Sequence, residues 1–256
     1  MDKNSGLTLS LCKAFDILAC FTAETPQLRI IDLTKKLKMT QSNISRLIGT
    51  MAAYGYVEKN EETGYYQLGP AIITMSSIAL NSIEIRKQAL PELFALEQKY
   101  GVGANLAILK YNSMYYLAHV DSRTSPRMYT MVGYTNPLHC TAIGKILLAF
   151  LDKEERDRIL DETGLPAYTH NTITDREILE RELEVIRQNG YSREYGEHAV
   201  GSACIAAPIR DRTGRVVAGL SASGKFNQEN LIDQEDQVAQ AVIDAANMVS
   251  NKLGCF

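Results

Sequence analysis

Residues 1–69 carry three short helical patterns followed by two short strand patterns, and this order constrains the fold more than any other feature. Apolar side chains recur at helical spacing over 8–22, 30–37 and 40–54, and Tyr54-Gly55 ends the third pattern. Strand patterns follow at 56–59 and 65–68, and the loop between them ends on Gly64, which is typical of a hairpin. Three small helices and a hairpin in this order predict a winged helix-turn-helix.

The third helical pattern has the composition of a helix that enters the major groove of DNA. Short polar side chains and one cation lie away from its apolar face, at Gln41, Ser42, Asn43, Ser45 and Arg46. A helix in the groove reads base edges with such polar groups near its N-terminus, and reaches phosphate or guanine with a basic residue. Thr40 and Ser42 are both candidates for its N-cap.

A local excess of positive charge coincides with this region, although the formal net charge of the chain is −3. The segment 29–46 contains one acidic residue, Asp32, and five basic residues: Arg29, Lys35, Lys36, Lys38 and Arg46. Tyr65 and Tyr66 lie on the hairpin, within reach of a sugar-phosphate backbone. The candidate DNA contacts are Lys38, Gln41, Ser42, Asn43, Ser45, Arg46 and Tyr65. The alternatives are a solvated helix surface or a small helical domain that binds protein.

The composition of the whole chain excludes several classes of protein. With 45% hydrophobic and 22% charged residues over 256 positions, the chain is neither disordered nor collagen-like. Its five cysteines include no Cys-x-x-Cys pair, which argues against a disulfide framework and a structural zinc site. The longest apolar stretch, Ile146–Leu151, is too short for a membrane helix, and the N-terminus lacks a signal-peptide pattern. We therefore expect a cytoplasmic protein without a membrane partner.

A linker helix is predicted at 70–86, between a domain at 1–69 and a larger one at 87–256. Pro70 suits its first turn, and its many apolar residues indicate packing on a partner, such as a second copy of the chain. Further helices are expected at 89–100, 141–151, 153–162, 175–189 and 234–253, and strands at 103–110, 114–120, 128–132, 191–195, 202–209 and 216–223. Hairpin-connected strands with helices between them predict an α/β (α+β) fold, with a mixed or antiparallel sheet covered by helices.

Several segments of the chain match the motifs of a known family in the same order. They are SLCKAFDIL at 10–18, ISRLIGTM at 44–51, GYV at 55–57, YYQLG at 65–69, PLHCTAIGK at 137–145, LLAF at 147–150, GYS at 190–192, Glu197, Gly201 and CIAAP at 204–208. In this order they resemble the IclR family of bacterial transcription regulators. Two positions depart from the family pattern: Lys38 stands where glycine is frequent, and Ala203 where arginine is usual.

The resemblance implies a ligand-responsive regulator, in most members a repressor, with a double-stranded DNA operator and a small-molecule effector as partners. It implies a winged helix-turn-helix, a linker helix and a C-terminal effector domain similar to the GAF fold. It also implies homodimers or dimers of dimers that bind a pseudo-palindromic site. No cofactor, metal or catalytic residue is expected.

By the same resemblance, the effector site lies between the segment 139–145 and the strands that carry Glu194, Cys204, Ser221 and Ser223. The expected residues are Met128, His139, Thr141, Ala142, Ile143, Glu194, Cys204, Ser221 and Ser223. Hydroxyls and the first N–H groups of a helix suit a small carboxylate, while Met128 and Ile146 would form an apolar wall. Because Glu194 is acidic, it should face a ligand hydroxyl or carbonyl hydrate. This chemistry favours a hydroxy-, keto- or sugar-derived carboxylate.

Two alternatives to a ligand-responsive regulator remain open at this point. An enzyme could use Cys204 or Ser221 as nucleophile with His139 or His198 as base, although the chain has no nucleophile elbow, metal-ligand spacing or phosphate loop. A regulator that senses redox state could use the thiol of Cys140 or Cys204.

Overall fold

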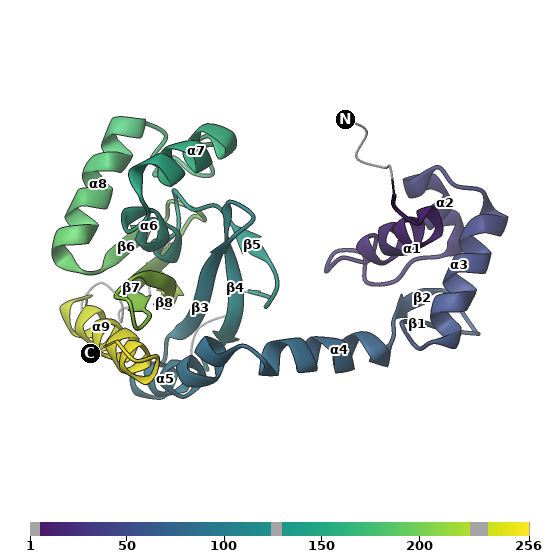
Figure 1. Cartoon of the computed structure of the whole chain (residues 1–256), viewed down its shortest axis with the longest axis horizontal. Coiled ribbons are helices and arrows are strands. Elements are labelled where there is room, and N and C mark those ends of the chain that lie inside the picture. The colour runs from purple at the N-terminus through teal and green to yellow at the C-terminus, as the bar shows by residue number, and fades with distance from the viewer. Residues whose placement is uncertain (1–5, 124–129, 226–234, 256) are drawn as a thin grey trace. The chain divides into compact units, whose positions relative to one another are not determined.

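The computed structural model describes residues 6–123, 130–225 and 235–255 (Figure 1). The chain divides into two compact units, Met1–Ser82 and Ile83–Phe256. Each unit is built around buried apolar clusters of its own. Within the described ranges, no helix is both long enough and apolar enough to span a membrane.

The N-terminal unit begins with three helices and a two-stranded hairpin, and α4 (Pro70–Asn81) follows them. The three helices and the hairpin are α1 (Leu9–Ala19), α2 (Ile30–Leu37), α3 (Gln41–Ala53), β1 (Val57–Lys59) and β2 (Tyr66–Leu68), with the two strands antiparallel. The apolar faces of the three helices meet at Ile17, Leu33, Ile44 and Ile48, which are fully buried. The predicted winged helix-turn-helix is therefore confirmed.

The turn between α2 and α3 has a backbone shape that few side chains adopt. Lys38 has a φ of 52°, in the left-handed region that favours glycine. Glycine adopts this conformation without steric cost, which agrees with its frequency at this position in the family that the sequence resembles. Thr40 follows as the N-cap of α3, since its hydroxyl accepts a hydrogen bond from the backbone N–H of Asn43.

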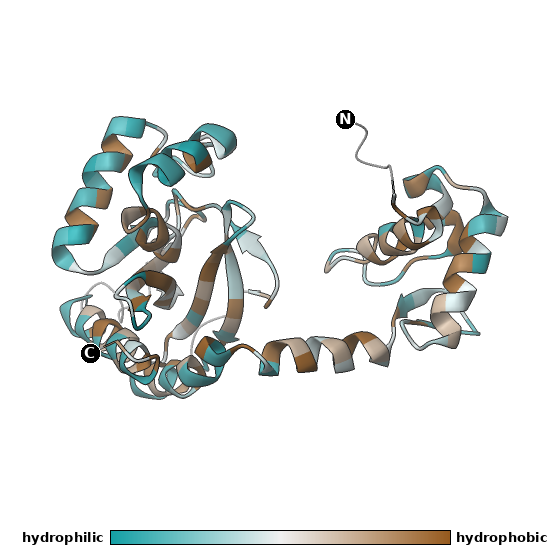
Figure 2. Cartoon of the chain, in the orientation of Figure 1, coloured by the Kyte–Doolittle hydropathy of each residue, from teal (hydrophilic) through white to brown (hydrophobic). Residues whose placement is uncertain are grey.

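The linker helix is shorter than the predicted segment 70–86. Helix α4 spans Pro70–Asn81, and a new helix, α5, spans Glu84–Tyr100. Between them Ile83 is extended and the hydroxyl of Ser82 donates to the carbonyl of Ala79, so α4 ends here. The expected end at Arg86 is wrong because the apolar periodicity continues across this break. No residue of α4 is buried, and its apolar residues give it brown bands in Figure 2.

The C-terminal unit is organised by a six-stranded sheet in which every neighbouring pair is antiparallel. The strand order is β5-β4-β3-β8-β7-β6. Their bounds are β3 Gly103–Lys110, β4 Ser113–Val120, β5 Thr135–Asn136, β6 Ser192–Tyr195, β7 Ser202–Arg210 and β8 Val216–Lys225. Of the two predicted possibilities, a mixed or an antiparallel sheet, the structure has the second.

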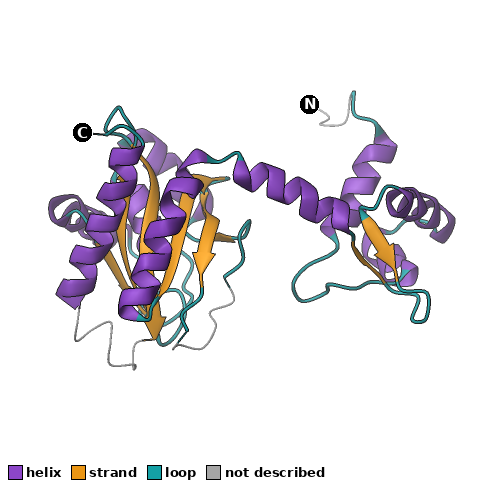
Figure 3. Cartoon of the chain, turned by 90° about the horizontal axis from the view of Figure 1, so that it is seen from below, coloured by secondary structure: helices purple, strands orange, loops and turns teal. Residues whose placement is uncertain are grey.

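Helices cover both faces of this sheet and bury a separate apolar cluster on each (Figure 3). On one face lie α5 and α9 (Glu235–Lys252). On the other face lie α6 (Ala142–Ala149), α7 (Lys153–Thr163) and α8 (Arg176–Asn189). The helix-covered sheet predicted from the alternating patterns is therefore confirmed.

The prediction of a strand at 128–132 is wrong for the residues of this segment that the structure describes. Residues 128 and 129 lie outside the described ranges, and 130–132 form no strand. Gly133 has a φ of +92° and turns the chain there, while its N–H donates to the carbonyl of Tyr116. The strand pairing begins only after this turn, where β5 joins the edge of β4.

The hairpin and the start of α4 are joined by a close backbone contact at Gly69. The N–H of Gly69 donates to the carbonyl of Tyr56, and the N–H of Ala71 donates to that of Gly55. A Cβ on Gly69 would lie 2.3 Å from the carbonyl oxygen of Gly55. Glycine is therefore required at position 69 by the approach of a second backbone segment.

Gly69→Ala should destabilise the N-terminal unit by about 1–3 kcal/mol, because the added methyl group forces the two backbone segments apart. Hydrogen exchange of the α3 amides in the full chain measures this free energy of opening. Gly49→Ala is the matched control, since no atom lies within 4 Å of its added Cβ in the middle of α3. It should stabilise the helix by about 0.5–1 kcal/mol. Equal protection in the two variants would contradict the proposed clash.

Candidate functional site

The outer face of α3 is polar. Ile44 and Ile48 point into the core, whereas the side chains on the opposite face are solvent-accessible: Gln41, Ser42, Ser45 and Arg46 are exposed, and Asn43 is half-buried. Lys38 is exposed in the turn that precedes the helix. Short polar groups, a guanidinium and an ammonium on one surface match what direct readout of a major groove requires.

The two tyrosines predicted for the hairpin have different environments. Tyr66 is buried in the core of the unit, and its backbone pairs with Leu28, so it is not a surface contact. Tyr65 is half-buried under the guanidinium of Arg29, which lies 4.4 Å from the ring centroid and donates to the hydroxyl at 2.9 Å. Tyr65 therefore holds Arg29 in place beside the hairpin, and Arg29 joins the candidate DNA contacts.

A cavity of about 370 Å³ lies in the C-terminal unit, a size suited to a small organic ligand. Its described lining is mostly neutral and polar or apolar, with Glu194 as its acid. The lining residues are Asn105, Met114, Tyr116, Thr130, Met131, Tyr134, Asn136, Thr141, Ala142, Ile143, Glu194, His198, Ala199, Ser202, Cys204 and Ser221. Neither lysine nor arginine occurs among these described residues.

Strand register assembles the polar floor of the cavity. Asn105 on β3 is paired with Ser221 on β8, and Glu194 on β6 is paired with Cys204 on β7. The side-chain amide of Asn105 donates to the hydroxyls of both Ser221 and Ser223, each at 3.2 Å. Ser221 and Ser223 thus share one face of β8, as their spacing of two residues predicts.

The N-terminus of α6 forms another wall. Thr141 caps the helix in an extended conformation, and its hydroxyl donates to the carbonyl of Pro137 at 2.7 Å. A Cβ on Gly144 would lie 2.3 Å from the carbonyl oxygen of Leu138, so this loop can fold onto the helix only over glycine. The N–H groups of Ala142 and Ile143, in the first turn of a helix, have no carbonyl partner within it and can bind an anion.

Glu194 anchors the loop 196–201 at the edge of the cavity. Its carboxylate accepts hydrogen bonds from the backbone N–H groups of Glu197 and His198 and from the hydroxyl of Ser202. Burial raises the pKa of Glu194, and the hydrogen bonds from His198, Glu197 and Ser202 oppose that effect. Although Glu194 lines the cavity, its carboxylate is engaged mainly by its own loop rather than left free for a ligand hydroxyl.

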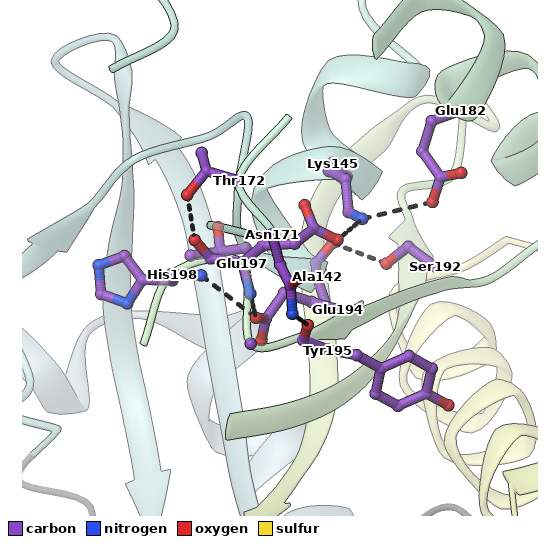
Figure 4. A network of polar contacts seen from close by, with 12 residues as sticks. Ala142, Lys145, Asn171, Thr172, Glu182, Ser192, Glu194, Tyr195, Glu197 and His198 are labelled. Atoms are coloured by element: carbon purple, nitrogen blue, oxygen red, sulfur yellow. Dashed lines mark hydrogen bonds and ion pairs between the residues drawn. The ribbon is translucent and has the colours of Figure 1, made fainter. Parts of the chain in front are cut away.

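A buried ion pair connects this loop to α6 (Figure 4). The Nζ of Lys145, whose side chain is 1% exposed, lies 2.6 Å from Oε1 of Glu197 and 3.3 Å from Oε1 of Glu182 on α8. Oε2 of Glu197 is buried without a hydrogen-bond partner among the described residues. Burial raises the pKa of Glu197, and Lys145 opposes that effect.

Not every residue expected at the effector site lines the cavity. His139 is buried beneath the loop that follows α7, where its Nε2 lies 3.1 Å from the carbonyl of Pro166, and burial lowers its pKa. Ser223 is bound by the amide of Asn105 but is not among the lining residues, and Ile146 lies inside the core of the α6 face. Met128 is outside the described residues. Thr141, Ala142, Ile143, Glu194, Cys204 and Ser221 do line the cavity.

Several lining residues were missed from the sequence, notably Asn105, Tyr116, Asn136 and Ser202. Asn105 gave a usable signal, because it is an amide within the otherwise apolar strand 103–109 and a buried amide needs partners. Asn136 and Tyr116 gave no such signal in the sequence, because they meet only through the pairing of β5 with β4. There the amide of Asn136 donates to the hydroxyl of Tyr116.

The thiols near the cavity have the environment of unreactive cysteines. Burial raises the pKa of Cys140 to about 12 and raises that of Cys204 well above its usual value. A protonated thiol is a poor nucleophile and a poor peroxide sensor. The environment of Cys204 and Cys140 therefore supports neither the enzyme nor the redox alternative.

Comparison with known families covers nearly the whole chain. Residues 10–61 match the IclR helix-turn-helix domain, and residues 77–251 match the C-terminal domain of the bacterial transcriptional regulator IclR. The chain belongs to the IclR family. This IclR-family protein is thus a DNA-binding transcriptional regulator with an effector-binding C-terminal domain, and not an enzyme.

Individual relatives agree with this assignment. The regulator is 34% identical over 260 residues to the transcriptional regulator KdgR of Dickeya chrysanthemi, covering 99% of this chain and 83% of that one. The crystal structure of the Thermotoga maritima IclR has a TM-score of 0.83 and 29% identity, covering 96% of this chain and 99% of that one. A structure of an IclR homolog from Microbacterium hydrocarbonoxydans, complexed with 4-hydroxybenzoate, has a TM-score of 0.83 at 24% identity, covering 95% and 98%, respectively.

Lys145→Met should destabilise the C-terminal unit by about 3 kcal/mol, because it leaves the carboxylate of Glu197 buried without its cation. Urea denaturation of the full chain measures this change. The double variant Lys145→Met/Glu197→Gln should recover part of the loss, since it removes the unpaired charge.

Lys59→Met is the control for this experiment, because it breaks an ion pair with Glu61 on the surface. Exposed pairs contribute little, so the denaturation midpoint should remain at the wild-type value. A wild-type midpoint for Lys145→Met would mean that the buried pair does not hold the loop.

Proposed function

We propose that this regulator is a repressor and that its effector is a small hydroxy-, keto- or sugar-derived carboxylate. The observation that carries the proposal is the chemistry of the cavity lining, where hydroxyls and side-chain amides surround the first N–H groups of α6. Those N–H groups suit the carboxylate oxygens of a ligand. The amides of Asn105 and Asn136 suit its hydroxyl or carbonyl groups.

The charge of the residues that line the cavity narrows the class of effector further. Glu194 borders the cavity, whereas no lysine or arginine does so among the described residues. A second carboxylate on the ligand would have no cation to pair with and would be repelled by Glu194. We therefore favour a ligand with one carboxylate and several hydroxyl or carbonyl groups over a dicarboxylate.

The N-terminal unit carries the features of a homodimer that binds a pseudo-palindromic operator. Leu11 and Phe15 on α1, and Ile73, Met75 and Ile78 on α4, are all more than half exposed. Such apolar surface is typical of a protein-protein interface, and we assign it to a second copy. Half-sites on DNA have a fixed spacing, so an effector that alters the packing of the dimer, or of a dimer of dimers, weakens binding.

The domain division that we propose is a winged helix-turn-helix at 1–69, the short linker helix α4, and an effector-binding and oligomerisation domain from Ile83 onward. The division of the chain into units at Ser82 supports this boundary. It assigns DNA recognition and effector recognition to separately folded parts. Each activity can therefore be removed by a substitution that leaves the other intact.

Arg46→Ala should lower DNA affinity by about tenfold or more, because the guanidinium is a base or phosphate contact on the exposed face of α3. The measurement is fluorescence anisotropy on a duplex selected from a random library by the wild-type protein. Arg181→Ala is the matched control, since it removes an exposed arginine from α8 in the other unit. If both variants bind like wild type, α3 is not the recognition helix.

Ser221→Ala should weaken effector binding by about five- to tenfold, which corresponds to the loss of one hydrogen bond. The measurement is a thermal-shift titration with glycolate, pyruvate, gluconate and 4-hydroxybenzoate. A saturating ligand at about 100 times its Kd stabilises the wild type by about 2.7 kcal/mol. Ser10→Ala, in α1, should leave the shift unchanged. A shift that is equal in Ser221→Ala and wild type would place the ligand elsewhere.

A further inference from the structure

A chain of hydrogen bonds connects the cavity floor to the protein surface. Oδ1 of Asp121 lies 2.8 Å from Nε2 of His119, and Nδ1 of His119 lies 2.7 Å from Oδ1 of Asn105. The amide nitrogen of Asn105 then donates to the hydroxyls of Ser221 and Ser223. Strand register produces this row, because Asn105 is paired with His119 on one side and with Ser221 on the other.

The burial of these groups changes along the row. Asp121 has a side chain that is 47% exposed, whereas that of His119 is 9% exposed. Asn105 and Ser221 are buried and both line the cavity. The row thus joins a carboxylate in solvent to a hydroxyl that borders the ligand cavity.

With Oδ1 of Asn105 facing the ring, one of two orientations open to the amide, hydrogen-bond valence sets where the protons lie. Oδ1 of Asn105 and the Asp121 carboxylate only accept, so both ring nitrogens of His119 must donate, as in the imidazolium. Both N–H groups of the Asn105 side-chain amide donate to the serine hydroxyl oxygens. The hydroxyl proton of Ser221 is not needed by Asn105 and is available for an oxygen atom of a ligand.

The same heavy-atom positions accommodate one other arrangement. In the neutral imidazole the proton on Nε2 donates to Asp121, and Nδ1 becomes an acceptor. The amide of Asn105 must then turn over, so that its nitrogen faces His119 and its oxygen faces the serines. Ser221 now donates its proton to Asn105 and offers only lone pairs to the cavity.

We propose that His119 is a positioning residue whose ring proton sets Ser221 as a hydrogen-bond donor or acceptor toward the effector. A ligand that presents a carboxylate or carbonyl oxygen to Ser221 binds the imidazolium form and takes up one proton at His119. This inference rests on the proposed effector site, and it adds a determinant that does not itself touch the ligand.

The charged groups around His119 are few among the described residues. Asp121 contacts its ring directly. Glu97 of α5 and Arg123 border the same hollow, and they pair with each other at 3.0 Å. β3 and β8 contribute the neutral Asn105, Ser221 and Ser223. Asp121 is therefore the carboxylate that is free to stabilise the imidazolium.

The first test needs no ligand. In the ¹⁵N-labelled full chain, the ring nitrogens of His119 and the side-chain amide of Asn105 are followed by NMR between about pH 5 and 8, the range in which histidine changes charge. The proposal requires both residues to change with one common midpoint. In His119→Gln the Asn105 signals should be independent of pH, whereas in His170→Gln, which removes an exposed histidine, they should follow the wild type. Asn105 signals that stay constant while His119 titrates would overturn the proposal.

The second test measures ligand affinity against pH with glycolate, pyruvate, gluconate and 4-hydroxybenzoate. Coupling to one proton predicts a loss of up to tenfold in affinity per pH unit above the His119 midpoint. In His119→Gln this component should be absent, which leaves only the pH dependence contributed by the lining groups Glu194 and His198. A wild-type profile that is flat for a bound ligand would contradict the proposal. If none of the four acids binds, the proposed effector class is wrong, and the ligand-free measurement still decides the role of His119.

Discussion

A buried ammonium group, that of Lys145, joins the helix and the loop that border the cavity of the C-terminal unit. The lysine belongs to α6, whose first turn supplies backbone N–H groups, and its partner Glu197 belongs to the loop that carries His198 and Ala199. Burying two charges costs desolvation free energy. Their mutual attraction offsets this cost only when the two groups are held at hydrogen-bonding distance. The ion pair therefore fixes one spacing between helix and loop, and with it the width of the cavity.

Strand register is the second constraint, because it decides which polar groups meet. Adjacent rows across the sheet place Asn105 beside Ser221, and Glu194 beside Cys204. Asn105, Cys204 and Ser221 have apolar neighbours on both sides along their own strands, whereas Glu194 lies between Arg193 and Tyr195. Across strands the amide of Asn105 donates to the hydroxyl of Ser221, whereas the carboxylate of Glu194 is satisfied by the loop that follows it and by Ser202. The interior can then hold a polar site without leaving these groups unbonded.

The sequence predicts most of the fold and part of the site. Helical periodicity located every helix of the winged helix-turn-helix. The family resemblance indicated Thr141, Cys204 and Ser221, and all three line the cavity. Neither could show that α4 ends at Asn81, since apolar residues continue past the break. The position of His139 outside the cavity lining could not be predicted, because it depends on a contact with the distant carbonyl of Pro166. Asn136 was missed because its neighbours come from long-range pairing, which spacing along one strand does not encode.

The backbone contact at Gly69 joins the hairpin and the first turn of α4 into one rigid unit. Two backbone hydrogen bonds cross this junction, and bending there would break both. A helix of twelve residues is a lever of about 18 Å, so a rotation of about 10° corresponds to about 3 Å of travel at its far end. A displacement of the C-terminal end of α4 should therefore tilt the hairpin and the helices packed against it, because the junction at Gly69 resists bending.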